Sequence, residues 1–187
     1  MKEIILASRS PRRSELLKKH GVSFRILVSE AEEVKDGALP IDIAKSNAFL
    51  KANAVFKDIK ENDIIVLGAD TVVALNDKIF GKPKDKQDAF NMLSSLSGKE
   101  HQVITGVSIL KREDNKETVL TLAEVTFVKF KELKKEEIDE YLLLSEAYDK
   151  AGSYALQGVA KKFVEYIKGD YENVVGLPVE KILKYLY

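Results

Sequence analysis

The chain has 187 residues, of which 45% are hydrophobic, and its 30 basic and 30 acidic side chains leave a net charge of zero. A chain of this size can bury a sizeable core, and we expect residues 1–187 to form a single domain. The balanced charge argues against a protein that holds nucleic acid through a basic surplus. Because the sequence has no cysteine, it excludes disulfides, iron–sulfur clusters, cysteine-based zinc sites and thiol nucleophiles.

The apolar runs are no longer than a strand, so the sequence predicts no membrane-spanning segment. The apolar stretch near the N-terminus, residues 4–7, is too short for a signal peptide. We therefore expect a cytoplasmic protein without membrane or nucleic-acid partners. The two histidines, His20 and His101, lie far apart and are expected to be surface or packing residues. Any bound metal should then be a hard divalent cation held by carboxylates.

Hydrophobic spacing, capping residues and turn residues predict an alternation of strands and helices. Ser10 before Pro11 is a typical helix start, and Gly21 is a typical stop. The predicted strands cover residues 4–7, 24–28, 64–75, 78–80, 102–110, 118–129 and 161–167, with a polar turn at 111–116. The predicted helices cover residues 11–20, 41–57, 85–96, 132–144 and 177–187. This order predicts an α/β fold with a mixed sheet and flanking helices.

Two arginines occupy an unfavourable place at the start of the first helix. Arg12 and Arg13 lie in its first turn, where the helix dipole disfavours cations by up to ~1 kcal/mol. The free backbone N–H groups of a helix start, together with Ser8 in the preceding loop, can cradle an anion. A bound phosphate would offset the unfavourable placement and accept paired hydrogen bonds from the guanidinium groups. The alternative is that both arginines are exposed and the cost is tolerated.

Asp70 interrupts a long apolar strand. An ionised carboxylate in such a run costs several kcal/mol unless it is paired, hydrogen-bonded or bound to a metal. Gly68 and Ala69 precede it and leave space beside the backbone for a ligand. A carboxylate that caps a nearby turn at a bulge is the alternative.

Three further polar side chains are candidates for binding. Lys51 lies three residues after Ala48 and four before Val55, which places it on or beside the buried stripe of its helix. A lysine that extends to water from this position is the alternative. Lys82 lies in a turn after a predicted strand, where an ordinary turn lysine is the alternative. Gln157 is an amide among small residues that offers a donor and an acceptor side by side.

Taken together, an anion cradle, several cations and a buried carboxylate indicate phosphoryl chemistry, in which carboxylates hold a divalent cation and Arg and Lys neutralise phosphates. Glu32 and Glu33 in the acidic loop at residues 29–40 could join the carboxylate. The sequence has no Gly-x-x-x-x-Gly-Lys-Ser/Thr loop, so a P-loop nucleotide hydrolase is excluded. Metal-assisted attack of water on a nucleotide phosphoanhydride is the chemical class that fits best.

A series of sequence blocks, in the same order along the chain, resembles the Maf family of septum-formation-inhibitor-like nucleotide pyrophosphatases. The blocks cover residues 6–13, 28–33, 68–73, 81–85, 96–98, 103–107, 149–152, 156–158 and 175–178. The resemblance implies an α/β fold with two lobes around a deep groove, similar to the inosine triphosphate pyrophosphatases. It also implies cleavage of a nucleoside triphosphate to the monophosphate and pyrophosphate with Mg²⁺ or Mn²⁺, and it suggests a homodimer.

The resemblance further implies roles for individual residues. Asp70 would activate water and, with Glu33, hold the metal, although Glu32 is adjacent and is the alternative ligand. The phosphates would be gripped by Ser8, Arg13, Lys51 and Lys82.

The resemblance extends to the choice of substrate. Arg12, Thr71 and Gln157 match the branch that acts on dTTP and UTP, whereas the branch acting on 7-methyl-GTP usually has an aromatic residue, Gln and Glu at these positions. A Gln amide can donate to O4 of uracil or thymine and accept from N3–H. We therefore predict a dTTP and UTP pyrophosphatase, which could also remove modified pyrimidine nucleotides. The alternatives are a nucleotide-binding regulator of cell division with incidental hydrolysis, or the 7-methyl-GTP branch.

Overall fold

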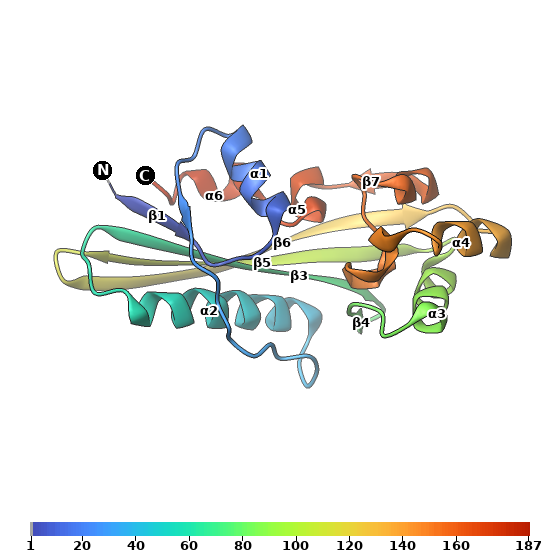
Figure 1. The fold of residues 1–187 in the computed structure, drawn as a ribbon, viewed down its shortest axis with the longest axis horizontal. Coiled ribbons are helices and arrows are strands. Elements are labelled where there is room, and N and C mark those ends of the chain that lie inside the picture. Colours follow the sequence, from blue (N-terminus) through green and yellow to red (C-terminus); the bar gives the residue numbers. More distant parts are fainter. Residues whose placement is uncertain (1) are drawn as a thin grey trace.

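The computed structural model describes residues 2–187, and its centre is a seven-stranded sheet in the order β2-β1-β3-β5-β6-β7, with β4 also paired to β3 (Figure 1). β1 runs parallel to β2 and to β3, and the remaining neighbours are antiparallel. The strands are β1 (Glu3–Leu6), β2 (Arg25–Ile26), β3 (Ile64–Leu75), β4 (Lys78–Phe80), β5 (Glu100–Glu113), β6 (Lys116–Phe130) and β7 (Val164–Lys168). The mixed sheet expected from the sequence is therefore confirmed.

Helices cover both faces of this sheet and one of its ends. The α-helices are α1 (Pro11–Lys19), α2 (Pro40–Asp58), α3 (Lys86–Leu96), α4 (Lys135–Tyr141), α5 (Tyr171–Val175) and α6 (Val179–Leu183). Figure 1 shows α2 below the sheet, α1, α5 and α6 above it, and α3 and α4 gathered at the far end. Three 3₁₀ helices join them at that end, η1 (Ser145–Tyr148), η2 (Ala151–Ser153) and η3 (Val159–Phe163). Among residues 2–187, no helix combines the length and apolar character needed to cross a membrane.

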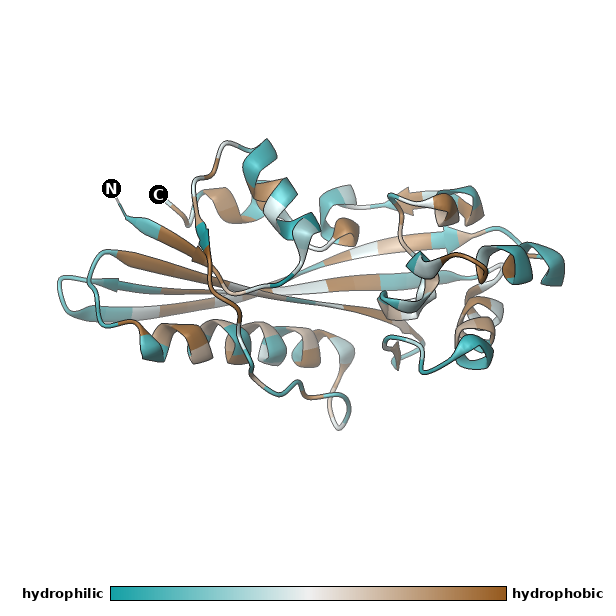
Figure 2. Ribbon diagram, in the orientation of Figure 1, coloured by the Kyte–Doolittle hydropathy of each residue, from teal (hydrophilic) through white to brown (hydrophobic). Residues whose placement is uncertain are grey.

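The buried side chains form separate cores at the two ends of the sheet. At one end, α1 and α6 pack on one face of β1 and β3, and α2 packs on the other face. At the other end, α3, α4 and the 3₁₀ helices pack around the ends of β5 and β6. Figure 2 shows apolar residues along β1 and β3 and polar residues at the tip of the β5–β6 hairpin. The molecule thus has two lobes joined by the long central strands.

Two glycines allow α2 to lie directly on the sheet. A Cβ atom at Gly68 of β3 would overlap the backbone at Ala48, and one at Gly106 of β5 would overlap the backbone at Ala44. Gly106 is the β5 neighbour of Asp70 in the sheet. The close approach therefore occurs beside the one carboxylate in the middle of β3, and it brings the side chains of α2 to that carboxylate.

The central hairpin is longer than predicted. We expected a polar turn at residues 111–116, but β5 continues to Glu113 and β6 starts at Lys116. Only Asp114 and Asn115 form the turn, and both have positive φ, 49° and 61°. Such a two-residue turn matches the twist of the strands it joins, so the polar residues before it stay paired in the sheet.

The C-terminal elements and one short strand also differ from prediction. The expected strand at 161–167 begins as η3, the expected helix at 132–144 shortens to α4, and the expected strand at 24–28 shortens to β2. The expected helix at 177–187 shortens to α6, and α5 is a separate short helix that precedes it. Beyond Leu183, the N–H groups of Tyr185 and Leu186 bond to carbonyls three residues back, so the chain ends in turns rather than in α-helix. Gly176, with φ of 133°, and Pro178 separate α5 from α6.

The lobe formed by α3, α4 and the 3₁₀ helices is called the distal lobe, and the lobe with α1 and α6 the proximal lobe; His101 lies in the core of the distal lobe. It is only 2% exposed, and its Nε2 lies 2.8 Å from the Tyr154 hydroxyl. Its ring meets the edge of Phe130 with a centroid separation of 4.9 Å. Burial lowers the pKa of His101 to about 4, because the charged imidazolium would lose its hydration. The histidine is therefore a neutral packing residue at pH 7.

We expect this buried histidine to weaken the fold as the pH falls. The folded-state pKa lies below the ordinary value of 6.5, so the stabilisation is complete above pH 6.5 and is lost between about pH 6.5 and 4. By linkage, the free energy of unfolding should fall by about 2 kcal/mol between pH 7.5 and 5 from this group alone. Urea unfolding of the wild type and His101→Asn across this range measures it. An equally steep loss in the variant would contradict the assignment to His101.

Candidate active site

A gap along one edge of β3 opens the molecule to solvent. β1 pairs with β3 only as far as Leu67, and β4 pairs with it only from Val73 onward. Between these points, in the part of the chain that the structure describes, no strand pairs with that edge of β3. Successive side chains of a strand point to opposite faces, so Asp70 faces α2 and Thr71 faces α1. Both can thus reach one cleft through the gap.

Asp70 is the centre of the α2 side of this cleft. The residue is 8% exposed, and its Oδ1 accepts a hydrogen bond of 2.6 Å from Lys51 Nζ. The same ammonium lies 2.6 Å from Glu33 Oε1 in the loop before α2. Lys51 is therefore an ion-pair partner of two carboxylates, and the alternative of a lysine that merely extends to water is wrong.

Arg13 is the centre of the α1 side. Its guanidinium donates to the Gly176 carbonyl at 2.8 Å, to Ser8 Oγ at 3.1 Å and to Thr71 Oγ1 at 3.1 Å. The Thr71 hydroxyl also lies 2.9 Å from the Thr105 hydroxyl. Burial lowers the pKa of Arg13, and the charge of Asp70 opposes this. The fork of Arg13 thus joins the loop after β1, the middle of β3 and the end of α5.

Arg12 is partly buried at the start of the same helix. Its Nε donates to the Val175 carbonyl at 3.3 Å. The two neighbouring arginines therefore bind successive carbonyls at the end of α5. The alternative of two fully exposed arginines is wrong.

Lys82 lies on the opposite wall, where it shares a carboxylate with a second lysine. Lys82 Nζ is 2.8 Å from Asp149 Oδ1, and Lys150 Nζ is 3.1 Å from Asp149 Oδ2. Hydrogen bonds from Lys82 and Lys150 lower the pKa of Asp149 to about 2. Lys82 itself is exposed, so an anion of higher charge can compete with Asp149 for it.

The cleft has a volume of about 1200 Å³ and brings all of the predicted site residues together. Its lining includes Ser8, Arg12, Arg13, Glu33, Lys51, Asp70, Thr71, Lys82 and Gln157. Of the two adjacent glutamates, Glu33 lines the cleft and Glu32 does not. Gln157 is exposed at the wall formed by the distal lobe.

Sequence reasoning missed three residues of this site. Asn47 is 3% exposed and donates to Asp70 Oδ2 at 3.1 Å. Asp149 holds the two lysines of the opposite wall, and Thr105 supports Thr71. Only Asn47 carried a usable signal, because it lies four residues before Lys51 and hence on the same face of α2.

The carboxylates of the cleft fit a divalent cation that is shared with a substrate. Within residues 2–187, no group of three His, Cys, Asp or Glu side chains is placed to hold a metal. Asp70 and Glu33 nevertheless converge on one point, the ammonium of Lys51. Mg²⁺ commonly binds through one or two carboxylates together with substrate phosphates. This donor set therefore fits such a cation.

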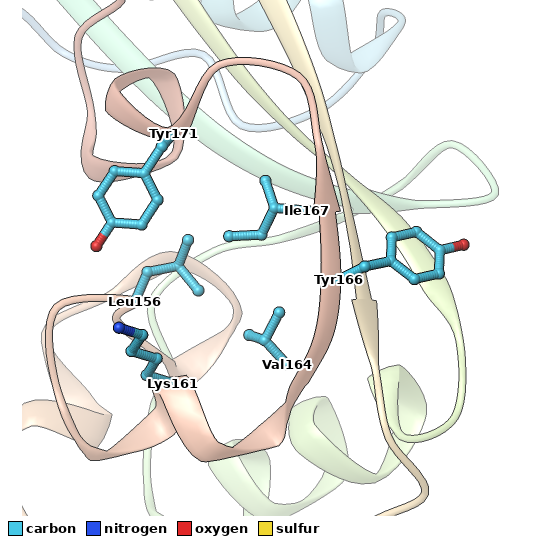
Figure 3. Close-up of a pocket in the computed structure, with 6 residues that line it drawn as sticks. All are labelled: Leu156, Lys161, Val164, Tyr166, Ile167 and Tyr171. Atoms are coloured by element: carbon cyan, nitrogen blue, oxygen red, sulfur yellow. The ribbon is translucent and has the colours of Figure 1, made fainter.

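A second, smaller pocket lies beside β7. It has a volume of about 230 Å³, and Figure 3 shows Leu156, Val164 and Ile167 gathered on one side of the strand, with the Tyr166 ring on the other. Lys161 and Tyr171 complete its lining. Leu156 lines both this pocket and the large cleft.

Comparison with known proteins identifies the family of this chain. The dTTP/UTP pyrophosphatase of Bacillus anthracis is 49% identical over 187 residues, which are 100% of this chain and 95% of that protein. The dTTP/UTP pyrophosphatase of Thermoanaerobacter sp. (strain X514) is 46% identical over 98% of this chain and 95% of its own. The Staphylococcus aureus Ham1 protein shares the fold, with a TM-score of 0.50, 14% identity and coverage of 99% of this chain and 98% of its own. The sequence model of the family described as "Maf-like protein" matches residues 3–187, and the chain therefore belongs to this family.

Proposed function

We propose that this chain is a nucleoside triphosphate pyrophosphatase that hydrolyses dTTP and UTP to the monophosphate and pyrophosphate. The observation that carries the proposal is the buried Asp70 carboxylate, held by Lys51 in a cleft whose other wall carries lysines. The names and high identity of the Bacillus and Thermoanaerobacter relatives support the same reaction and substrates. Removal of modified pyrimidine nucleotides would use the same chemistry.

In the proposed mechanism, cationic side chains from both lobes bind the triphosphate. Arg13 and Ser8 lie on the proximal wall, and Lys82 and Lys150 on the distal wall. The phosphate oxygens would replace Asp149 as partners of the two lysines. Such charge neutralisation stabilises the pyrophosphate leaving group as the bond between the α- and β-phosphates breaks.

Asp70 is the proposed general base. It accepts a proton from the water that attacks the α-phosphorus, and the hydrogen bond from Lys51 orients the carboxylate. Glu33 and Asp70 are the residues that would hold Mg²⁺ or Mn²⁺, and the cation would neutralise phosphate charge in the transition state.

The first experiment is pyrophosphate release from dTTP, UTP, CTP, dATP, GTP and 7-methyl-GTP with Mg²⁺ or Mn²⁺. Turnover confined to dTTP and UTP is the expected result. A preference for 7-methyl-GTP would keep the reaction but overturn the proposed substrates. Nucleotide binding without turnover would favour the regulator of cell division instead.

Thr71 accepts a hydrogen bond from Arg13, and we propose that it acts mainly by orienting that guanidinium. We also propose that Gln157 recognises the pyrimidine base. A glutamate at 157 cannot donate to O4 of uracil or thymine, whereas it suits the adjacent N–H groups of guanine. Gln157→Glu should therefore lower kcat/KM for dTTP relative to GTP by about tenfold or more. Gln87→Glu on the exposed face of α3 is the matched control. An unchanged ratio in Gln157→Glu would remove this residue as the base reader.

The cytoplasmic location and the homodimer stay predictions. Analytical ultracentrifugation of the full chain measures the second directly, and a sedimentation coefficient of a 21.0 kDa monomer at micromolar concentration would contradict it.

A further inference from the structure

Asn47 is a buried amide on α2, and its side-chain hydrogen bonds all go to groups outside that helix. It lies on α2 between the buried residues Ala44 and Ala48, one helical turn before Lys51. Its side chain crosses from α2 both to Asp70 and to the irregular loop that precedes the helix. The mechanism proposed above gives it no role.

The side chain of Asn47 uses both of its donors and its carbonyl oxygen. Nδ2 donates to Asp70 Oδ2 at 3.1 Å and to the Val34 carbonyl at 3.0 Å. Oδ1 accepts from the Val34 N–H at 2.7 Å. The amide therefore pairs with the backbone of Val34 much as a neighbouring strand would, while it also holds the carboxylate.

The packing of the protein does not explain these bonds. Val34 is 41% exposed as a residue and lies in a loop without helix or strand, so water could serve its backbone groups. Ala44, one turn earlier on the same face of α2, is buried without a polar side-chain atom, so packing at this face does not require an amide. What the amide adds is a fixed link between Asp70 and the residue that follows Glu33.

We propose that Asn47 is a positioning residue that holds the Asp70 carboxylate and the Glu33 loop in register with each other. The proposal rests on the proposed function. Asn47 and Lys51, one turn apart on α2, each donate to a different oxygen of Asp70, so together they fix the plane of the carboxylate. The contact of α2 with Gly68 and Gly106 makes that helix a rigid base for the arrangement. Because Val34 is held by the same amide, Glu33 keeps its place opposite Asp70.

Asn47→Leu tests this role, because leucine has a similar branched shape and makes no hydrogen bond. Loss of a residue that orients metal or catalytic ligands typically costs about 10–100-fold in metal affinity or activity. We expect a drop of about this size in Mn²⁺ affinity, measured by calorimetry with the metal alone, and in kcat for dTTP. KM for dTTP should change by less than about threefold, because the phosphate-binding residues are untouched. Asn53→Leu on the same helix is the matched control and should change none of these quantities.

Amide hydrogen exchange gives a readout independent of activity. In the wild type, the Val34 N–H should exchange more slowly than those of Glu32 and Glu33, and this protection should vanish in Asn47→Leu. Asn47→Ser, whose shorter side chain cannot span both partners, serves if the leucine variant does not fold. Wild-type exchange at Val34 as fast as at its neighbours would overturn the proposal, as would unchanged Mn²⁺ affinity and kcat in a folded variant.

The two proposals can fail separately. If the wild type releases no pyrophosphate from dTTP or UTP, the proposed function fails. Exchange at Val34 and Mn²⁺ affinity would still decide the role of Asn47.

Discussion

Asp70→Asn is expected to reduce pyrophosphate release from dTTP by about 10³-fold, because an amide cannot accept the proton of the attacking water. The loss should appear in kcat, since the residues that bind the triphosphate stay in place. The fold should survive, because Lys51 keeps its ion pair with Glu33. The new NH₂ group must face either Lys51 Nζ or Asn47 Nδ2, which loses one hydrogen bond and costs about 1–3 kcal/mol of stability.

Asp77→Asn is the matched control for this variant. Asp77 lies in the exposed turn just beyond β3 and has a φ of 63°, a conformation that asparagine adopts readily. The Asp77→Asn variant should retain full activity. Steady-state pyrophosphate release, with circular dichroism to verify folding, decides the matter. Near-wild-type turnover in a folded Asp70→Asn protein would eliminate Asp70 as the base.

Arg13→Lys is expected to lower kcat/KM for dTTP by about 10²-fold, or about 2.7 kcal/mol of transition-state stabilisation. Lysine keeps the charge but not the planar fork, so it cannot hold Gly176, Ser8 and Thr71 together. The loop after β1 and the end of α5 should then separate, and phosphate binding should weaken.

The control for this variant is Arg25→Lys, an exposed arginine paired with Glu3. This substitution also replaces a guanidinium by an ammonium, but far from the cleft, so kcat/KM should stay unchanged. Measurement of kcat and KM over a range of ionic strength adds a second check. If Arg13→Lys behaved like Arg25→Lys, charge alone would suffice at this position and the fork would have no special role.

These two variants probe opposite faces of one strand. Asp70 belongs to the α2 side of β3 and Thr71, with Arg13, to the α1 side. The unpaired stretch of β3 between β1 and β4 lets both sets of side chains reach the same cleft. The separation of base and phosphate-binding groups thus follows from the two-residue period of a strand.

Much of the site could be predicted because its residues break local rules. A carboxylate in an apolar strand and two arginines in the first turn of a helix are unfavourable without a partner, and the structure supplies partners for all three. Lys51 could not be decided in this way, because a lysine beside a buried stripe can equally extend to water. Only its contacts with Asp70 and Glu33 identify it as an ion-pair partner.

Asp149 and the loop contact of Asn47 show why the rest could not be predicted. The partner of Asn47 in the loop is a backbone, that of Val34, and backbone groups have no sequence signal. Asp149 is an ordinary acidic residue until the fold places Lys82 beside it from 67 positions away. The C-terminal helix also ends earlier than predicted, at Leu183, because the N–H groups of Tyr185 and Leu186 bond to carbonyls three residues back.

The sequence by itself determined the mixed α/β architecture, the chemical type of the site and the family to which the chain belongs. Hydrophobic period, turn residues and unfavourable placements are local properties, and they can be recognised without knowing what lies across the fold. The tertiary structure alone decided which groups touch. Gly68 and Gly106 bring α2 onto the sheet, the gap in β3 opens the cleft, and Asn47 reaches both Asp70 and Val34. Such contacts join segments that are distant in the chain, so they exist only once the whole fold has formed.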